Sequence, residues 1–185
     1  LPLIGEHWID NALAASACAL SVEAQPNDIK EGLKEITPIK GRMFPYFLHN
    51  DRILIDDTYN ASFESVKNCI RTLEKLPGER LYIGSTLTEV GDFSEDLHQQ
   101  IAHDLKNAKF DYIYLTGDPK IIDIMQKIYD RIKYIPDLES IKKVLSDHLL
   151  EDDIKSILIK GARKYKLDES VDFALKQTKV QFCTQ

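Results

Sequence analysis

The sequence predicts an α/β protein with a Rossmann-like, mostly parallel sheet of five or six strands and helices on both faces, preceded by a short helical segment. Two observations support this. From about residue 53 onward, short apolar runs alternate with longer stretches that place apolar residues at helical spacing. Connections long enough to hold a helix make successive strands parallel, with right-handed crossovers that put helices on both faces. The first forty residues lack this alternation.

The N-terminal segment predicts two helices. Residues 1–4 are apolar and include no start methionine, so we expect a chain cut from a longer one. Residues 7–22 are rich in alanine, with Ile9, Leu13, Ala17 and Leu20 three or four residues apart, which predicts a helix packed closely against a neighbour. A second helix is expected over 28–35, and a domain boundary near 37–41.

The remainder predicts a hairpin followed by alternating elements. Residues 41–48 and the run from Ile53 read as two strands joined by a tight turn at 49–51. The elements expected after them are helix 63–76, strand 80–84, helix 93–109, strand 112–116, helix 120–129, strand 131–135, helix 138–149, strand 156–160 and helix 167–176. We expect the tail, 178–185, to be poorly ordered.

Composition restricts the class of protein. The 185 residues suffice for one generous domain, or for one domain with part of another attached. A net charge of −6, from 24 Lys and Arg against 30 Asp and Glu, argues against a non-specific nucleic-acid binder. Three widely separated cysteines suggest neither a disulfide framework nor a zinc site. Because no apolar run reaches the roughly 20 residues of a membrane span, we expect a cytoplasmic protein without a membrane partner.

Two adjacent carboxylates end the apolar run of the second predicted strand. Asp56 and Asp57 stand where a strand turns into a helix, the edge at which open α/β sheets bind ligands. Since successive side chains alternate, one acid should be held in the fold while the other reaches the cleft. A second reading needs no ligand, because Ser62, with Glu64 and Ser65 in the first turn, could satisfy the free backbone donors of the following helix. Both readings remain open.

Polar side chains elsewhere have similar alternatives. Arg42 follows Gly41 and could reach a phosphate or a domain partner, or be solvated. Asn11 either faces solvent or hydrogen-bonds a planar group. Residues 160–164 hold three cations at the end of the last strand, and either bind an anionic or carboxylated substrate or form a solvated basic loop. Their position at a strand end favours binding.

Other features favour structural interpretations. Neither His7 nor His98 has an acidic or nucleophilic residue at a spacing typical of a catalytic pair, so both are expected to be structural. The segment 84–86 is expected to be a plain turn. The sequence contains no Gly-x-x-x-x-Gly-Lys-Ser/Thr loop and so cannot cradle a triphosphate in that way by itself.

Six segments stand in a telltale order along the chain: GEHWIDNALAA at 5–15, IKEGL at 29–33, KGRM at 40–43, IDDTYNAS at 55–62, EVG at 89–91 and IKGAR at 159–163. Together they resemble the Mur ligases, and among them most closely the MurF type, the UDP-N-acetylmuramoyl-tripeptide:D-alanyl-D-alanine ligases. The Asp-Asp-Thr-Tyr-Asn-Ala element is the most type-specific piece.

The resemblance implies a three-domain, ATP-dependent carbon–nitrogen ligase of peptidoglycan precursor synthesis. Residues 1–40 would be the end of the central ATPase domain, and 41–185 the C-terminal Rossmann-like domain that closes as a lid. ATP and Mg²⁺, bound mainly by the absent part, would convert the carboxylate of UDP-N-acetylmuramoyl-tripeptide to an acyl phosphate, which the amine of D-alanyl-D-alanine attacks. The partners would be these substrates and the rest of its own central and N-terminal domains. We expect a monomer, and this chain alone to be inactive.

The resemblance also implies roles for individual residues. Asn11 would meet the adenine, Arg42 the phosphates and Asp57 the ribose hydroxyls, with Asn60 beside the nucleotide. The residues expected to face the incoming dipeptide are Lys160, Ala162 and Arg163. No metal ligand and no certain catalytic residue is assigned in this chain.

Three positions depart from the family pattern. Trp8 stands where an asparagine is usual, Ser85 begins a Ser-Thr-Leu that replaces Gly-Asp-Met, and Phe63 replaces a proline. Two other readings therefore stay open. One is another Mur-type ligase, of the diaminopimelate-adding, cyanophycin or folylpolyglutamate kind, and the other is a non-catalytic Rossmann-like module that binds a nucleotide or a partner.

Overall fold

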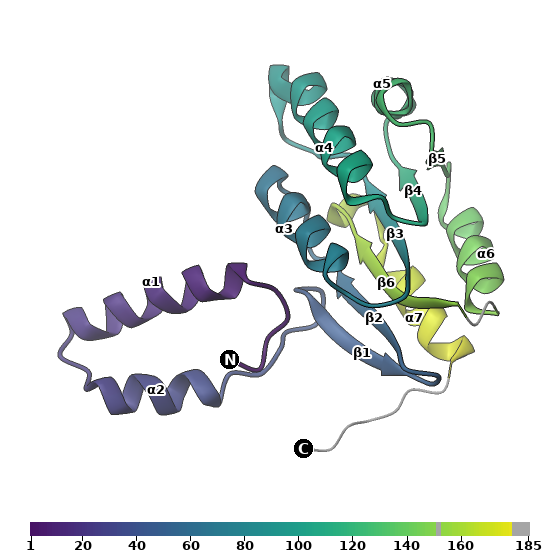
Figure 1. Cartoon of the computed structure of the whole chain (residues 1–185). Helices are drawn as coiled ribbons and strands as arrows, with labels where there is room; N and C mark the ends of the chain where they lie inside the picture. The colour runs from purple at the N-terminus through teal and green to yellow at the C-terminus, as the bar shows by residue number, and fades with distance from the viewer. Residues whose placement is uncertain (151–152, 179–185) are drawn as a thin grey trace.

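The protein is a six-stranded sheet covered by helices on both faces, with a helical hairpin beside it (Figure 1). The structure, a computed structural model, describes residues 1–150 and 153–178. The helices are α1 (His7–Ser21), α2 (Pro26–Lys34), α3 (Phe63–Glu74), α4 (Ser94–Ala108), α5 (Pro119–Ile128), α6 (Leu138–Leu149) and α7 (Asp168–Gln177), with 3₁₀ turns at Gly91–Phe93 and Arg163–Tyr165. The strands are β1 (Phe44–Leu48), β2 (Arg52–Asp57), β3 (Glu79–Ser85), β4 (Tyr112–Thr116), β5 (Ile132–Tyr134) and β6 (Ile154–Lys160).

The strand order is β1-β2-β6-β3-β4-β5, and only the edge strand β1 is antiparallel to its neighbour. The β1–β2 turn spans the three residues between the paired Leu48 and Arg52, and Asn50 and Asp51 within it have positive φ (61° and 55°), a backbone that asparagine and aspartate tolerate better than most residues. The last strand in sequence, β6, is inserted between β2 and β3, so residues far apart in the chain, such as Asp57 and Lys160, become neighbours in the sheet.

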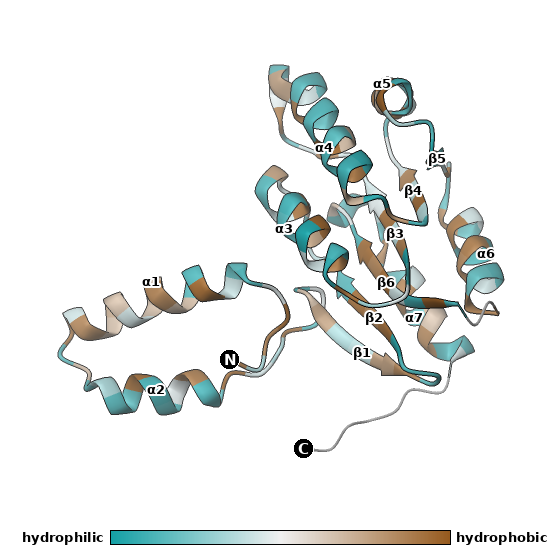
Figure 2. Ribbon diagram, viewed as in Figure 1, coloured by the Kyte–Doolittle hydropathy of each residue, from teal (hydrophilic) through white to brown (hydrophobic). Residues whose placement is uncertain are grey.

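Two apolar layers enclose the sheet. On one face α3, α4 and α5 pack against side chains such as Ile55 and Leu158. On the other face α6 and α7 pack against side chains such as Leu54 and Ile157. Figure 2 shows hydrophobic residues along the strands and hydrophilic ones on the outer sides of these helices. The predicted fold class, with helices on both faces of a mostly parallel sheet, is confirmed.

The elements agree closely with those predicted, with differences of a few residues at their ends. The helix expected over 93–109 begins after a 3₁₀ turn and ends at Ala108, because the next residue, Lys109, has a left-handed backbone (φ 51°, ψ 48°). The expectation for the tail falls, apart from Thr178, outside the described residues. None of the helices within 1–150 and 153–178 combines the length and the apolar character needed to cross a membrane.

Helix α1 differs from expectation in its surroundings. It forms as its sequence predicts, but none of its residues is buried. Ile9, Leu13 and Leu20 are 55%, 63% and 53% exposed. The residues of α1 that line cavities shared with the sheet domain lie in its first turns, between His7 and Asn11. The close neighbour expected for its apolar face is therefore not found among the described residues.

Candidate functional site

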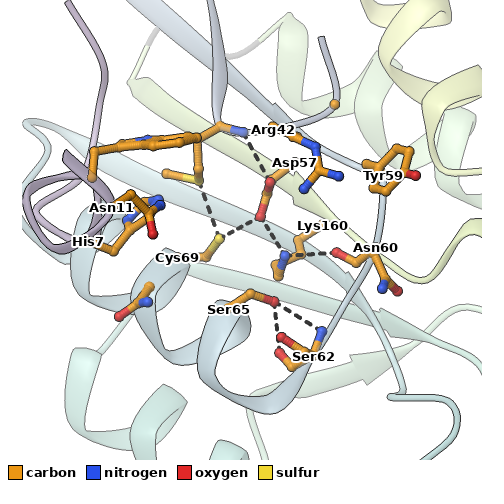
Figure 3. A pocket seen from close by; sticks show the side chains of 14 residues that line it. His7, Asn11, Arg42, Asp57, Tyr59, Asn60, Ser62, Ser65, Cys69 and Lys160 are labelled. Carbon is orange, nitrogen blue, oxygen red and sulfur yellow. Dashed lines mark hydrogen bonds and ion pairs between the residues drawn. The ribbon is translucent and has the colours of Figure 1, made fainter. Parts of the chain in front are cut away.

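A polar cavity of about 230 Å³ lies at the carboxyl-terminal ends of β2 and β6 (Figure 3). These strands are parallel neighbours, and their register places Asp57 opposite Lys160. The cavity walls come from the start of α1, the linker before β1, the β2–α3 loop, the first turns of α3 and the end of β6. The lining residues are His7, Trp8, Asn11, Gly41, Arg42, Met43, Asp57, Tyr59, Asn60, Ser62, Ser65, Asn68, Cys69 and Lys160.

A buried ion pair forms the floor of this cavity. Lys160 Nζ lies 2.5 Å from Asp57 Oδ2, and the two residues are 1% and 9% exposed. The same carboxylate accepts from the Cys69 thiol (3.0 Å) and, through Oδ1, from the Met43 backbone N–H (3.0 Å). Lys160 also donates to the Asn60 carbonyl at 2.9 Å. Burial raises the pKa of the Cys69 thiol well above its ordinary value, which keeps it protonated as a donor.

Asp56 points to the opposite side of the strand and holds the linker in place. Its carboxylate accepts from the Gly41 N–H at 3.0 Å and from the backbone and hydroxyl of Thr58 at 3.1 and 2.7 Å. Burial raises the pKa of this carboxyl, and these hydrogen bonds oppose the rise. As the alternation predicted, one acid is held in the fold while Asp57 borders the cleft.

The capping interpretation, made for Ser62 and Ser65, also holds. Ser65 Oγ donates to the Ser62 carbonyl (2.8 Å) and accepts from the Ser62 N–H (3.0 Å), which fixes the start of α3. Asp56 and Asp57 make no contact with these backbone groups among their recorded hydrogen bonds. The two readings of this loop therefore apply to different residues.

Two arginines meet at Tyr59, which is 46% exposed. The Arg42 guanidinium lies 4.1 Å from the centre of the Tyr59 ring, and that of Arg163 lies 5.7 Å from it. Within the described part of the chain neither arginine forms a salt bridge. The Tyr59 N–H donates to the Gly41 carbonyl at 3.0 Å. This hydrogen bond links the segment before β1 to the β2–α3 loop next to the two arginines.

Helix α1 contributes three planar side chains to one wall. Figure 3 places His7 and Asn11 at this side of the cavity, and Trp8 lines it as well. His7 Nδ1 and Trp8 Nε1 are buried without a hydrogen-bond partner in the described chain. Burial lowers the pKa of His7, which favours the neutral imidazole.

The residues expected to face a dipeptide are separated by the structure. Lys160 belongs to the ion pair with Asp57. Ala162 is 3% exposed, and its N–H donates to Ser85 Oγ at 2.9 Å. Arg163 is exposed beside Tyr59. Of the four residues expected at a nucleotide, Asn11, Arg42, Asp57 and Asn60 all line the one cavity.

Some contributors could not be identified from the sequence. Cys69 and Ser65, four residues apart in α3, share a helix face that reaches the cavity. The four-residue spacing can be read from the sequence, but the sequence of α3 does not indicate which face of the helix meets the end of β2. Tyr59 stands two residues after Asp57. Its ring contacts Arg42 and Arg163, which come from distant segments, so its place in the site could not be predicted from neighbouring residues.

His98 and the turn after β3 are structural, as predicted. His98 Nε2 accepts from the Leu87 N–H at 2.8 Å, and Nδ1 lies 2.6 Å from the Ser94 carbonyl, so the neutral tautomer with hydrogen on Nδ1 satisfies both contacts. Ser85 Oγ is occupied by Ala162, which leaves this turn a plain connection. In the described ranges, no group of three acidic, histidine or cysteine side chains could hold a metal ion.

A Rossmann-like sheet with its cavity at the carboxyl ends of two parallel strands, bordered by a linker and a helix from outside the sheet, defines an α/β domain of the ligand-binding class. Residues 41–163 match the family model described as the Mur ligase, glutamate ligase domain, and the chain belongs to the Mur ligase family. The resemblance found in the six sequence segments is thus confirmed.

Individual relatives agree with this assignment. The chain is 33% identical over 171 residues to the UDP-N-acetylmuramoyl-tripeptide–D-alanyl-D-alanine ligase of Escherichia coli, an alignment that covers 92% of this chain and 37% of that protein. It is 30% identical to the ligase of the same name from Buchnera aphidicola, over 97% of this chain and 39% of the relative. The crystal structure of MurF from Acinetobacter baumannii matches with a TM-score of 0.85 and 26% identity, over 95% of this chain and 39% of that one. The chain therefore spans about two fifths of the length of these relatives.

Proposed function

We propose that this chain is the C-terminal part of an ATP-dependent amide ligase that joins D-alanyl-D-alanine to UDP-N-acetylmuramoyl-tripeptide. The observation that supports this most strongly is the cavity at the ends of β2 and β6, where Asn11, Arg42, Asp57 and Asn60 converge from separate segments. Members of the Mur ligase family are ATP-dependent ligases, and the relatives that align with nearly the whole chain are named for this dipeptide.

The nucleotide would lie across the cavity. Asn11 offers an amide to the adenine, Arg42 a guanidinium to the phosphates and Asp57 a carboxylate to the ribose, with Asn60 at the edge. The chain has no triphosphate loop, so residues outside it would hold the phosphates. In this proposal residues 1–40 are the end of a central ATPase domain and 41–185 the closing C-terminal domain.

The incoming dipeptide would approach the other side of Tyr59. Arg163 is exposed there and could pair with a carboxylate. Lys160 and Ala162 would act by holding the loop that presents it, since both are buried. The described residues do not form a Mg²⁺ site, so the metal that such a reaction uses would be held elsewhere in the enzyme.

The reaction would begin with the tripeptide carboxylate attacking the terminal phosphoryl group of ATP, releasing ADP and forming an acyl phosphate. The amine of the dipeptide then attacks the acyl carbon, phosphate leaves and the amine loses a proton. This chain would contribute by positioning the nucleotide and excluding water when it closes. A cytoplasmic, monomeric enzyme is part of the same proposal.

The parent reading frame provides the test. We expect it to encode an upstream Gly-Lys-Thr/Ser loop and a domain for a UDP-sugar, and the purified product to release phosphate from ATP only when both substrates are present. Replacing D-alanyl-D-alanine by diaminopimelate or glutamate separates this ligase from the other Mur types. A reading frame without the phosphate loop, or a product that consumes no ATP with any of these amines, would contradict the proposal.

A further inference from the structure

Tyr59 is the common contact of two arginines that lie far apart in the chain. Its ring centre lies 4.1 Å from the guanidinium carbon of Arg42 and 5.7 Å from that of Arg163, both within the roughly 6 Å over which a cation interacts with an aromatic face. Arg42 comes from the linker before β1, and Arg163 from the 3₁₀ turn after β6. Figure 3 shows Arg42 and Tyr59 side by side at the cavity. The two guanidinium groups are therefore no farther apart than the sum of these two distances.

Neither cation has a counter-ion in the described part of the chain. Within residues 1–150 and 153–178, neither guanidinium group forms a salt bridge or a hydrogen bond. Their separation is comparable with the Debye length of about 10 Å at 0.1 M ionic strength, so the two like charges repel each other weakly. A guanidinium that lies on an aromatic face keeps its in-plane N–H donors free for a carboxylate or a phosphate. The pair can thus accept anions that the described residues do not supply.

The backbone fixes the position of the Tyr59 ring before any substrate binds. The Tyr59 N–H donates to the Gly41 carbonyl, and the preceding residue, Thr58, donates twice to the Asp56 carboxylate, at 3.1 and 2.7 Å. The linker passes so close that a Cβ added to Gly41 would lie 3.3 Å from Tyr59 Cβ. The exposed side chain of Arg42, by contrast, has many rotamers of its own. The ring is therefore the fixed group that can limit the freedom of the arginines.

We propose that Tyr59 is a positioning residue, which holds Arg42 for the nucleotide phosphates and Arg163 for the carboxylate of the incoming dipeptide. This rests on the proposed function, which assigns those anions to the two arginines, and it adds that one side chain orders both. Tyr59 acts through the arginines and need not touch either anion. Its removal should weaken the binding of two substrates at once. The third substrate should be unaffected, because the proposed function places the UDP-sugar in another domain.

The first test measures the steady-state kinetics of Tyr59→Leu in the longer ligase of the proposed function. Loss of the ring should raise the KM for ATP and the KM for D-alanyl-D-alanine each about two- to fivefold, the effect of losing an exposed cation–aromatic contact. The kcat and the KM for UDP-N-acetylmuramoyl-tripeptide should stay as in wild type, because the ring contributes equally to ground-state and transition-state binding. Unchanged KM values for ATP and the dipeptide would overturn the proposal. A rise in all three KM values would also overturn it, because it would indicate a structural role.

Further variants separate the aromatic face from the hydroxyl and from the position in the chain. Tyr59→Phe keeps the face, so its KM values should return to within about twofold of wild type. Tyr134→Leu removes a tyrosine that is 39% exposed and lies outside the cavity, and this matched control should behave as wild type. If Tyr59→Leu does not fold, Tyr59→Gln takes its place, since it also lacks a ring and suits an exposed position. A Tyr59→Phe enzyme as impaired as the ring-less variant would rule the proposal out.

A double-variant cycle identifies the group through which the ring acts. In an Arg163→Met background, Tyr59→Leu should no longer change the KM for the dipeptide but should still raise the KM for ATP, because Arg42 remains. The same effect on the dipeptide with and without Arg163 would contradict the positioning role. The two hypotheses fail differently. A ligase that consumes no ATP with any of the amines contradicts the proposed function, whereas an active ligase that is indifferent to Tyr59→Leu contradicts only the role of Tyr59.

Discussion

At the scale of single residues, burial decides what each charge contributes. The Lys34–Glu31 pair has a short contact of 2.7 Å, but its side chains are 58% and 62% exposed, so solvent screens it. The Asp57–Lys160 contact is similar in length, and its lysine side chain is 1% exposed. Removing one partner of a buried pair leaves an uncompensated charge that solvent cannot reach.

Asp57→Ala should therefore lower the free energy of unfolding by about 3–5 kcal/mol, because it leaves the Lys160 ammonium buried and unpaired. Urea denaturation of the chain measures this. Glu31→Ala, which breaks the exposed pair, should cost less than about 1 kcal/mol.

The variant Asp57→Asn with Lys160→Met is the control for charge. It should be more stable than Asp57→Ala, because neither group is then ionised in the interior. An Asp57→Ala protein as stable as wild type would mean that water or another group already compensates Lys160. In the longer ligase, Asp57→Ala should also raise the KM for ATP strongly.

His98 should make stability depend on pH. Burial lowers its pKa below the ordinary 6.5, although the hydrogen bond with Ser94 opposes the shift. Between the lowered folded value and 6.5 the unfolded chain binds more protons than the folded one, so stability falls as the pH drops through this window. The midpoint of urea denaturation should thus be lower at about pH 5 than at about pH 7.5.

His98→Gln keeps an acceptor for the Leu87 N–H but cannot be protonated, so it should reduce this pH dependence. His103→Gln, an exposed histidine on the same helix, should leave it as in wild type. A pH dependence that is identical in the two variants would assign the effect to other groups.

At the scale of elements, the turns at the strand ends depend on backbone geometry as much as on side chains. Gly117, between β4 and α5, has φ +129°, and a Cβ at this position would fall on Thr86 Oγ1. Thr86 in turn accepts from the Asp118 N–H at 3.2 Å and lies 2.9 Å from the Tyr165 hydroxyl. Three loops at the ligand edge of the sheet thus meet around one glycine.

Gly117→Ala should lower the free energy of unfolding by about 2–3 kcal/mol, from the unfavourable φ together with the overlap with Thr86. Gly32→Ala provides the opposite case. Gly32 lies in α2, and a Cβ there would meet nothing within 4 Å, so this variant should raise helix stability by about 0.5–1 kcal/mol. Urea denaturation followed by circular dichroism distinguishes the two, and equal effects would contradict the backbone argument.

At the scale of the whole molecule, the chain provides one wall of the proposed nucleotide site. Arg42, Asp57 and Asn11 come from three segments, yet the triphosphate loop is absent from the sequence. Along α1 the apolar side chains Ile9, Leu13 and Leu20 stay exposed. Both features fit a chain that acts together with further protein.

The chain alone should bind ATP weakly or undetectably in calorimetry, because the groups that would hold the phosphates are missing. Trp8 is the only tryptophan and lines the cavity, so its fluorescence gives a second measurement of the same event. Tight, magnesium-dependent binding by the 185-residue chain would contradict the proposal that the site is shared with another domain.

Local sequence determined the elements of this protein. Apolar runs and helical spacings depend on neighbours within a few positions, which is why strand 112–116 and helix 138–149 were predicted with the ends the structure gives them. The separation of Asp56 from Asp57 also follows locally, from the alternation of side chains along one strand. The order of the strands could not be predicted in this way.

Tertiary structure alone decided the composition of the site. Inserting β6 beside β2 brings Lys160 to Asp57 across 103 positions, and this converts one member of an apparent basic loop into a buried counter-ion. The same insertion brings Arg163 to the Tyr59 ring, which Arg42 also contacts. Side-chain pairing across a sheet depends on which strands are neighbours, and no pattern within either strand specifies its neighbour.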